Sequence, residues 1–184
     1  MKTIILFSGN ARSGKDYISE KLKSHLEKTN SVCKFAFADL LKQYLCILFN
    51  ISLDELDKLK NTEEIFTKNN LTMRDLLQRF GTELFVNTID KYYWTKQVAN
   101  KILTTNSKYF IISDFRFLHE LDISNYLPND CIIKTVKIVN FEQIKSSSHL
   151  SEKNLDNFKF DVIIDNTNYS YSFDINDFKE IINE

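Results

Sequence analysis

The segment from Gly9 to Lys15 has the residue types and the spacing of a phosphate-binding loop. It follows the pattern G-x-x-x-x-G-K and stands between a short apolar run and a helical repeat of apolar residues. Two glycines let the backbone wrap around a phosphate, the following helix N-terminus adds a favourable dipole, and Lys15 can reach the β- and γ-phosphates. With only three glycines in the chain, chance agreement is rare, and the alternative is an ordinary glycine turn. The expected nucleotide-binding residues are Gly9, Asn10, Ala11, Arg12, Ser13, Gly14, Lys15, Asp16 and Tyr17.

One position departs from the usual form of this loop. Ser or Thr commonly follows the lysine and offers its hydroxyl to Mg²⁺, but Asp16 stands there. A carboxylate is also a hard oxygen ligand, so Asp16 can hold Mg²⁺ directly or through water. The alternative is that Asp16 only favours the start of the helix electrostatically.

Arginine is scarce in this chain, and each Arg is therefore informative. The four among the 24 basic residues are Arg12, Arg74, Arg79 and Arg116. A planar guanidinium can bind two phosphate oxygens at once, whereas the ammonium of Lys is a point charge. Arg74, Gln78 and Gly81 lie within about 60° of one another on a helical wheel. Arg74 can therefore capture a phosphate while Gln78 binds a base edge; the alternatives are a surface salt bridge for Arg74 and a helix C-cap for Gly81.

The elements that must position these residues alternate between strands and helices. This order indicates an α/β fold with a mostly parallel sheet and helices on both faces. The predicted strands are Lys2–Ser8, Val32–Phe37, Tyr109–Ser113, Cys131–Val139 and Val162–Ile164. The predicted helices are about Gly14–Lys28, Asp39–Leu48 with Asp39 as N-cap, Ser52–Lys60 with Ser52 as N-cap, Thr72–Leu84, Lys91–Leu103, Phe117–Tyr126 and Phe173–Ile182.

Asp114 follows the buried run Tyr109–Ser113. A doubly wound sheet binds its ligands just beyond the carboxyl ends of its strands, and the loop at Gly9 opens at that edge too. Asp114 is therefore a candidate for metal or phosphate chemistry, with a helix N-cap as the alternative.

Composition and charge exclude several classes of protein. The 184 residues carry 24 basic and 25 acidic side chains, so no global field draws the chain to nucleic acid or to an anionic membrane. The three cysteines form no C-x-x-C pair, which argues against a disulfide framework or a structural zinc site and favours the cytoplasm. The apolar run Ile4–Phe7 is too short for a signal peptide, and none approaches a membrane span.

The Gly14-Lys15-Asp16 ending of the loop resembles that of two kinase families. These are the deoxynucleoside monophosphate kinases of large bacteriophages and the animal-type phosphomevalonate kinases. The resemblance to the phage kinases covers most of the chain. Beyond the loop it is carried by Arg74, by Gln78-x-x-Gly81-Thr82 with its spacing to Trp94, by Ser113-Asp114-Phe115-Arg116, by His149, Ser151 and Glu152, and by Asp165-Asn166.

The resemblance implies a three-layer P-loop nucleoside triphosphate hydrolase fold in a single domain of residues 1–184. It also implies a helical acceptor-binding region at about 38–105 and a lid at about 145–158 that closes on ATP. The implied reaction is Mg²⁺-dependent transfer of the γ-phosphoryl of ATP to a deoxynucleoside 5′-monophosphate. The implied roles are catalysis by Lys15, Arg116, Asp114 and Arg12, Mg²⁺ binding by Asp16 and Asp114, acceptor binding by Asp39, Lys42, Arg74, Gln78, Gly81, Thr82 and Trp94, and adenine binding at Asn166 and Thr167.

Two other functions remain open at this point. The loop with Asp16 and the run Leu155-Asp156-Asn157-Phe158 also resemble phosphomevalonate kinases, which have no base to bind. A non-catalytic ATP sensor is the second alternative, although Lys15, Asp114 and Arg116 together weigh against it. The apolar helices expected at Leu40–Phe49 and Lys91–Leu103 allow a homodimer.

Overall fold

The computed structural model describes residues 1–65, 67–140, 155 and 157–182. The chain forms two compact units, one from Met1–Ala36 with Val98–Glu184 and the other from Phe37–Gln97. The expected single domain of residues 1–184 stays a prediction.

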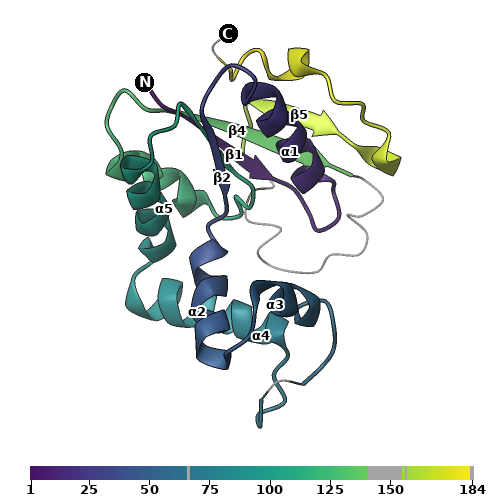
Figure 1. Ribbon diagram of the computed structural model, residues 1–184, viewed down its shortest axis with the longest axis vertical. Coiled ribbons are helices and arrows are strands. Elements are labelled where there is room, and N and C mark those ends of the chain that lie inside the picture. Colours follow the sequence, from purple (N-terminus) through teal and green to yellow (C-terminus); the bar gives the residue numbers. More distant parts are fainter. Residues whose placement is uncertain (66, 141–154, 156, 183–184) are drawn as a thin grey trace. The chain divides into compact units, whose positions relative to one another are not determined.

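The first unit is built on a parallel sheet of five strands in the order β2-β3-β1-β4-β5 (Figure 1). The strands are β1 Thr3–Ser8, β2 Val32–Phe35, β3 Tyr109–Ile112, β4 Ile132–Val139 and β5 Val162–Asp165. All residues of β1 and β3 are buried, as expected for central strands covered on both faces. The predicted α/β class is therefore confirmed. Because the strands are parallel, their carboxyl ends lie at one edge of the sheet.

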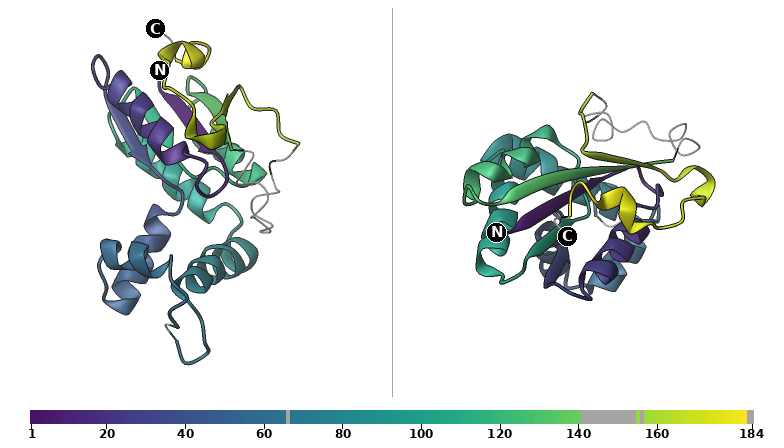
Figure 2. Two further views of the ribbon diagram at one scale, coloured as in Figure 1. Left: turned by 90° about the vertical axis from the view of Figure 1, so that its right-hand side faces the viewer. Right: turned by 90° about the horizontal axis from the view of Figure 1, so that it is seen from above.

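Helices cover both faces of this sheet (Figure 2). Helix α1, Lys15–Leu26, packs Ile18, Leu22 and Leu26 against one face. Side chains alternate along a strand, so Phe110 points to the other face. There Lys101, in the part of α5 (Tyr93–Thr104) that belongs to this unit, lies over the ring of Phe35, which contacts the ring of Phe110.

The second unit is helical and has its own core. Its elements are α2 Asp39–Phe49, α3 Leu53–Leu59, α4 Met73–Gln78 and the π-helix η1 Arg79–Ile89, followed by the first residues of α5. The buried residues at its centre are Leu41, Leu45, Leu56, Met73, Leu76 and Trp94. The Ser52 hydroxyl caps α3 by accepting a hydrogen bond from the N–H of Glu55 (3.2 Å), as the sequence predicts.

Two predictions about these helices are wrong. The N-cap of α2 is Ala38 in a helical conformation, and Asp39 is the first helical residue, where its charge favours the helix dipole. The regular repeat expected from Thr72 to Leu84 changes to a π-helix at Arg79. A π-helix bonds i to i+5, so the 100° wheel no longer applies beyond Gln78 and Leu84 lies 41% exposed.

Three shorter segments also differ from a regular α-helix. Leu118–Tyr126, within the predicted helix Phe117–Tyr126, is 3₁₀, and the predicted closing helix contains a 3₁₀ turn at Ile175–Phe178. A further 3₁₀ segment, Thr167–Tyr169, follows β5. None of the described helices is long and apolar enough to cross a membrane.

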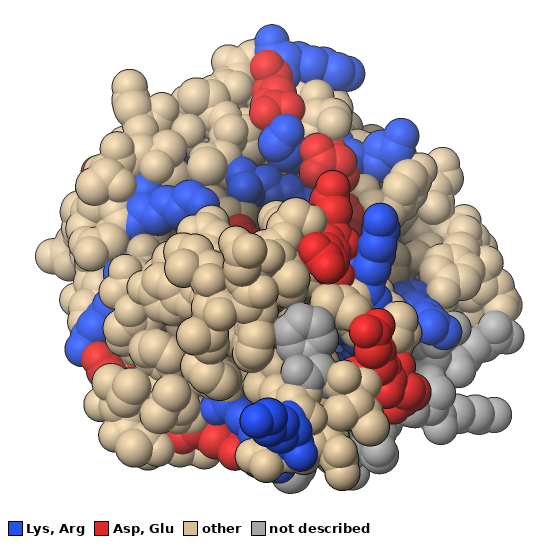
Figure 3. All heavy atoms as spheres, turned by 60° about the horizontal axis from the view of Figure 1, so that its bottom comes forward, with Lys and Arg blue, Asp and Glu red and all other residues tan. Residues whose placement is uncertain are grey.

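Charged residues of both signs are interspersed on the face shown in Figure 3, beside a broad area with few charges. This agrees with the nearly equal totals of 24 basic and 25 acidic residues.

Candidate active site

The phosphate-binding loop connects β1 to α1 and has an unusual backbone. Gly14 has φ 89°, and Arg12, which is not glycine, has φ 61°. The N–H of Ser13 donates to the carbonyl of Asn10 (3.1 Å) and closes the turn. A Cβ at Gly9 would lie 2.6 Å from Ser13 Oγ and 2.7 Å from the Ile138 carbonyl oxygen. A side chain at Gly9 does not fit, and Gly14 needs its left-handed φ, so both glycines of the motif have a backbone reason.

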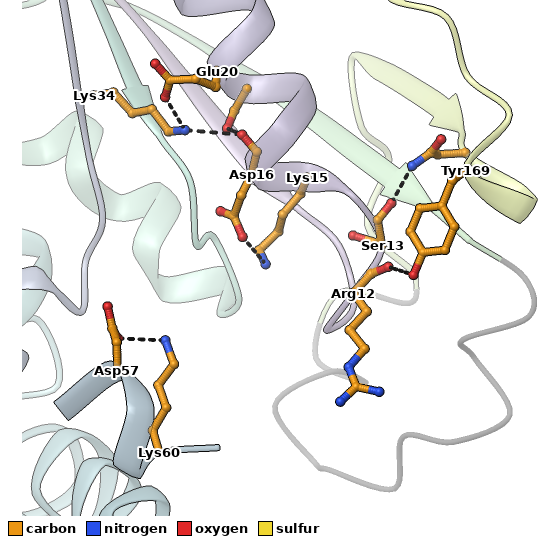
Figure 4. Close-up of polar contacts among 11 residues, drawn as sticks. Arg12, Ser13, Lys15, Asp16, Glu20, Lys34, Asp57, Lys60 and Tyr169 are labelled. Carbon is orange, nitrogen blue, oxygen red and sulfur yellow. Dashed lines mark hydrogen bonds and ion pairs between the residues drawn. The ribbon is translucent and has the colours of Figure 1, made fainter. Parts of the chain in front are cut away.

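The loop delivers Lys15 to the first turn of α1. Its side chain is only 13% exposed, and its Nζ lies 3.5 Å from Asp16 Oδ2 (Figure 4). The Asp16 carboxylate is 74% exposed, while its backbone carbonyl accepts from Ser19 Oγ (3.0 Å) and Lys34 Nζ (3.3 Å). Lys34 also pairs with Glu20 at 2.9 Å, and this hydrogen bond lowers the pKa of Glu20. The first turn of α1 is thus fixed while the Asp16 carboxylate faces solvent.

These features fit an anionic phosphate group. The first N–H groups of an α-helix have no acceptor within the helix and attract anions. Lys15 adds a cation at the same place. Ser13 is 1% exposed, and its Oγ has no hydrogen-bond partner among the residues the structure describes. Buried polar groups are normally satisfied, so this hydroxyl suits a loop that closes on a bound phosphate.

Asp114 lies in the turn after β3, and its neighbours tie that turn to two strand ends. The N–H of Ser113 donates to the Phe35 carbonyl at the end of β2 (3.1 Å). The N–H of Phe115 donates to the Phe7 carbonyl near the end of β1 (2.9 Å). Asp114 therefore stands at the carboxyl edge of the sheet, where β1 leads into the phosphate-binding loop.

A buried carboxyl group, that of Glu120, accepts hydrogen bonds from the main chain that follows this turn. Its Oε2 accepts from the N–H groups of Arg116 (2.7 Å) and Phe117 (2.9 Å). Burial, together with the nearby charge of Asp114, raises the pKa of Glu120 to about 8. The Arg116 side chain itself is exposed. Sequence reasoning did not assign Glu120 a role, because nothing in a linear pattern shows which backbone groups a carboxyl accepts from.

Mg²⁺ has two candidate ligands in this unit, Asp16 and Asp114. The described residues contain no group of three or more His, Cys, Asp and Glu side chains that could hold a metal. Mg²⁺ commonly keeps several waters and binds one or two carboxylates together with substrate phosphates. The carboxylates present therefore fit Mg²⁺ that arrives with a nucleotide rather than an ion held by protein alone.

The second unit gathers three cations from three helices. Lys42 on α2 and Lys60 after α3 both bind Asp57 Oδ1, at 3.1 and 2.8 Å. Arg74 on α4 donates from its Nε to the Lys60 carbonyl (3.3 Å). Burial opposes ionisation of Asp57, but the hydrogen bonds from Lys60 and Lys42 outweigh it and lower the pKa of Asp57. Asp57 thus binds two of the three cations, Lys42 and Lys60, while Arg74 contacts the main chain at Lys60.

Sequence reasoning proposed Lys42 and Arg74 for this region but missed Lys60 and Asp57. The chain contains many lysines, and only the packing of α3 against α2 and α4 distinguishes Lys60 from the rest. Asp57 is one of several acidic residues in the polar helix α3, which begins at Leu53. No signal in the sequence separates a counter-ion from an ordinary solvated carboxylate.

The remaining acceptor candidates divide between surface and core. Gln78 is exposed, and Thr82 and Asp39 are half-buried. Gly81 is buried, and its carbonyl accepts a hydrogen bond from Trp94 Nε1 (2.9 Å). Trp94 is also buried, with only 8% of its surface exposed. The helix C-cap alternative for Gly81 is wrong, because Gly81 lies inside η1.

Asn166 and Thr167 follow β5, as the sequence predicts. Asn166 is buried, and its Nδ2 donates to the Ser13 carbonyl (2.9 Å) in the phosphate-binding loop. Thr167 bonds Asp165 Oδ1 through its N–H (2.8 Å) and its Oγ1 (2.6 Å). The predicted lid at 145–158, with His149, Ser151 and Glu152, lies outside the described residues except for positions 155, 157 and 158.

Comparisons with known proteins place the chain in a family. A family model described as deoxynucleotide monophosphate kinase matches residues 51–174. A protein of Enterobacteria phage T4 named deoxynucleotide monophosphate kinase is 30% identical over 98 residues, which is 52% of this chain and 39% of that protein. One of Escherichia phage RB69 with the same name is 24% identical over 98 residues, 52% of this chain and 38% of that protein.

The match thus spans about two fifths of the length of each curated relative. The family model includes the turn with Asp114 and Arg116 and the segment at Asn166, and it includes the cationic cluster except Lys42. Because that model matches more than half of the chain, the chain belongs to the deoxynucleotide monophosphate kinase family.

Proposed function

We propose that this protein transfers the γ-phosphoryl group of ATP to the phosphate of a deoxynucleoside 5′-monophosphate. The observation that carries the proposal is the phosphate-binding loop, with Lys15 at the start of α1 and the anchored Asp114–Arg116 turn at the same sheet edge. A phosphate loop alone would serve any nucleotide-binding protein. Lys15, Arg116 and Asp114 together are the cations and the acid that phosphoryl transfer requires. Membership of the family adds the acceptor class.

On the donor side, the loop and the α1 N-terminus bind the β- and γ-phosphates of ATP. Lys15, Arg12 and Arg116 neutralise the charge that develops as the phosphoryl group moves. Asp16 and Asp114 hold Mg²⁺, which neutralises phosphate charge when bound. The adenine packs against the segment at Asn166 and Thr167, whose own N–H groups donate to the Val139 carbonyl and to Asp165 Oδ1.

On the acceptor side, the cluster of Lys42, Lys60, Arg74 and Asp57 binds the monophosphate. A phosphate monoester carries close to two negative charges at neutral pH, which balances the excess of two positive charges in the cluster. Gln78, exposed one turn beyond Arg74, binds the base edge. An oxygen of the acceptor phosphate then attacks the γ-phosphorus in line, and ADP leaves.

The acceptor assignment is tested with Arg74→Ala beside the matched control Arg79→Ala. Both arginines are exposed on neighbouring turns. Arg74 is connected to the cluster by its hydrogen bond to the Lys60 carbonyl, whereas Arg79 helps to lower the pKa of Asp75. Loss of a charge-assisted phosphate contact should raise the KM for every accepted deoxynucleoside monophosphate by about 10- to 100-fold. Arg79→Ala should leave these KM values near those of the wild type. Equal effects of the two substitutions contradict the assignment.

A further inference from the structure

The segment after β5 has a backbone that ordinary residues rarely adopt. Asn168 has φ 56° and Tyr169 has φ 55°, so two successive residues other than glycine are left-handed. Such a conformation is costly for a bulky residue such as Tyr, and it persists only where surrounding contacts hold it. Side chains of this segment contact the phosphate-binding loop.

Two side chains of this segment hold consecutive carbonyl groups of the phosphate-binding loop, and Figure 4 shows the contact made by Tyr169. Tyr169 Oη donates to the carbonyl of Arg12 at 2.9 Å. Asn166 Nδ2 donates to the carbonyl of Ser13, also at 2.9 Å. Arg12 is the residue of the loop that is left-handed without being glycine. The two hydrogen bonds therefore act on the part of the loop whose conformation is least favourable.

Asn166 is itself fixed in place. It is 4% exposed, its N–H donates to the Val139 carbonyl (2.7 Å), and its Oδ1 accepts from the N–H of Tyr171 (3.2 Å). A Cβ on Gly14 would collide with its Nδ2, so the amide occupies the space that the glycine leaves open. The loop is thus held against the end of β5 by a rigid group.

Thr167 stiffens the bend between these two side chains. Its N–H and Oγ1 both bind Asp165 Oδ1, and these hydrogen bonds lower the pKa of Asp165. The carbonyl of Thr167 accepts from Ser170 Oγ (2.7 Å). The bend is held by its own side chains, and it brings the Tyr169 hydroxyl to the loop.

Holding these carbonyls also orients the N–H groups that follow them. A trans peptide is planar, and its C=O and N–H point in opposite directions. With the Ser13 carbonyl directed at Asn166, the N–H of Gly14 is directed away from Asn166 and joins the amides at the N-terminus of α1. A loop with this orientation needs little rearrangement when an anion binds.

We propose that Asn166 and Tyr169 are positioning residues that preset the phosphate-binding loop for the triphosphate of ATP. The inference rests on the proposed function for the identity of the nucleotide. Tyr169 acts through a single hydroxyl on a 58% exposed side chain, so that its contribution can be removed without touching the core. Asn166 acts from a buried position.

The test is Tyr169→Phe, with Tyr171→Phe as the matched control. Tyr171→Phe also removes a phenolic hydroxyl, but the Tyr171 Oη donates to Asp177 Oδ2 (2.8 Å) and accepts from the N–H of Asp174 (3.3 Å), and neither contact is to the loop. The dissociation constant of ATP with Mg²⁺ is measured by calorimetry without any acceptor, and the melting temperature of each variant is recorded. Tyr169→Phe should weaken ATP binding about three- to tenfold, the range for one net hydrogen bond. Its melting temperature should be no lower than that of Tyr171→Phe, which loses more hydrogen bonds.

Steady-state kinetics give the readout that a merely structural role would not move. Tyr169→Phe should raise the KM for ATP and leave the KM for the acceptor unchanged. Asn166→Ala should weaken ATP binding further, and if that variant fails to fold, Tyr169→Phe decides alone. The inference is overturned if Tyr169→Phe binds ATP as tightly as the wild type and Tyr171→Phe. A wild-type protein that binds ATP but phosphorylates no deoxynucleoside monophosphate refutes the proposed function instead, and the binding comparison still decides the inference.

Discussion

Arg116 combines an exposed guanidinium with a backbone held by a buried carboxyl. Its N–H donates to Glu120 Oε2 at 2.7 Å, while its side chain is open to solvent at the carboxyl edge of the sheet. The main chain is thus anchored and the side chain can reach a ligand. This is the arrangement expected of a residue that must meet phosphate oxygens in one orientation.

Arg116→Lys keeps the positive charge but should still lower the activity relative to the wild type. A guanidinium binds two phosphoryl oxygens at once, whereas an ammonium is a point charge. We expect kcat to fall at least about tenfold with little change in the KM for ATP, because the lost contact forms in the transition state. Steady-state kinetics at saturating ATP check this. Wild-type kcat in Arg116→Lys would show that the guanidinium does not act on the reacting phosphates.

Glu120 makes the stability of the metal-free protein depend on pH. Burial and the charge of Asp114 raise its folded-state pKa to about 8 from the ordinary 4.5, so the folded state binds more protons than the unfolded state between these values. The free energy of unfolding should therefore fall as the pH rises from about 5 to 8, by at most about 1.4 kcal/mol per pH unit from this group.

Glu120→Gln should remove this dependence. The amide copies the shape of the protonated acid, and its oxygen can accept from the same N–H groups of Arg116 and Phe117. Urea unfolding at pH 5, 6, 7 and 8 compares the two proteins. The free energy of unfolding of Glu120→Gln, relative to that of the wild type, should increase as the pH rises. A constant difference would mean that Glu120 is ionised throughout this range.

At the scale of elements, the π-helix η1 is packed tightly at Gly81. The Gly81 carbonyl accepts from the Trp94 indole, and a Cβ at Gly81 would lie 2.7 Å from Leu41 Cδ2. Leu41 is buried in the core of the second unit and precedes Lys42 of the cationic cluster. Close packing here connects the core of the unit to the proposed acceptor site.

Gly81→Ala should destabilise the protein by about 1 kcal/mol. Overpacking a core costs roughly 1–3 kcal/mol, and the better helix propensity of Ala offsets about 1 kcal/mol of this. Leu41→Val removes the atom that the new methyl group meets. In that background Gly81→Ala should cost less, and a double-mutant cycle measured by urea unfolding reports the coupling. Purely additive effects would show that the two residues do not compete for space.

The elements that the sequence predicts well are those with local causes. The loop from Gly9 to Lys15 follows from glycine placement, and the strand Tyr109–Ile112 follows from a short apolar run. The π-helix could not be predicted, because the apolar residues after Thr72 fit a 3.6-residue period equally well. Gly81 lies inside this helix, and its carbonyl accepts from the Trp94 indole, a tertiary contact that no local pattern shows.

The candidate site divides in a similar way. The positions of Lys15 and Asp114 follow from the glycine loop and from the end of a predicted strand. Those of Lys60 and Tyr169 follow from no local pattern. Lys60 acts beside Asp57 only once α2, α3 and α4 pack together, and Tyr169 acts on a backbone carbonyl 157 residues earlier in the chain. A carbonyl acceptor has no side-chain signature, so a sequence pattern cannot show that it needs a partner.

At the scale of the whole molecule, the two units have separate cores and carry separate sets of candidate site residues. The sheet unit comes from Met1–Ala36 and Val98–Glu184, so β1 finds its neighbours β3 and β4 only across the intervening segment. The helical unit, Phe37–Gln97, is one continuous stretch of the chain. Substitutions in the core of the second unit should therefore alter acceptor kinetics more than ATP binding.

The most direct measurement identifies the product. The wild-type protein, ATP and Mg²⁺ are incubated with each deoxynucleoside 5′-monophosphate in turn, and ADP and the deoxynucleoside diphosphate are quantified by chromatography. Lys15→Ala, which removes the loop cation without disturbing a core residue, serves as the control. The account predicts equal amounts of ADP and of one or more deoxynucleoside diphosphates, absent with Lys15→Ala. Formation of no deoxynucleoside diphosphate from any of these acceptors, or ADP without a phosphorylated product, would contradict it.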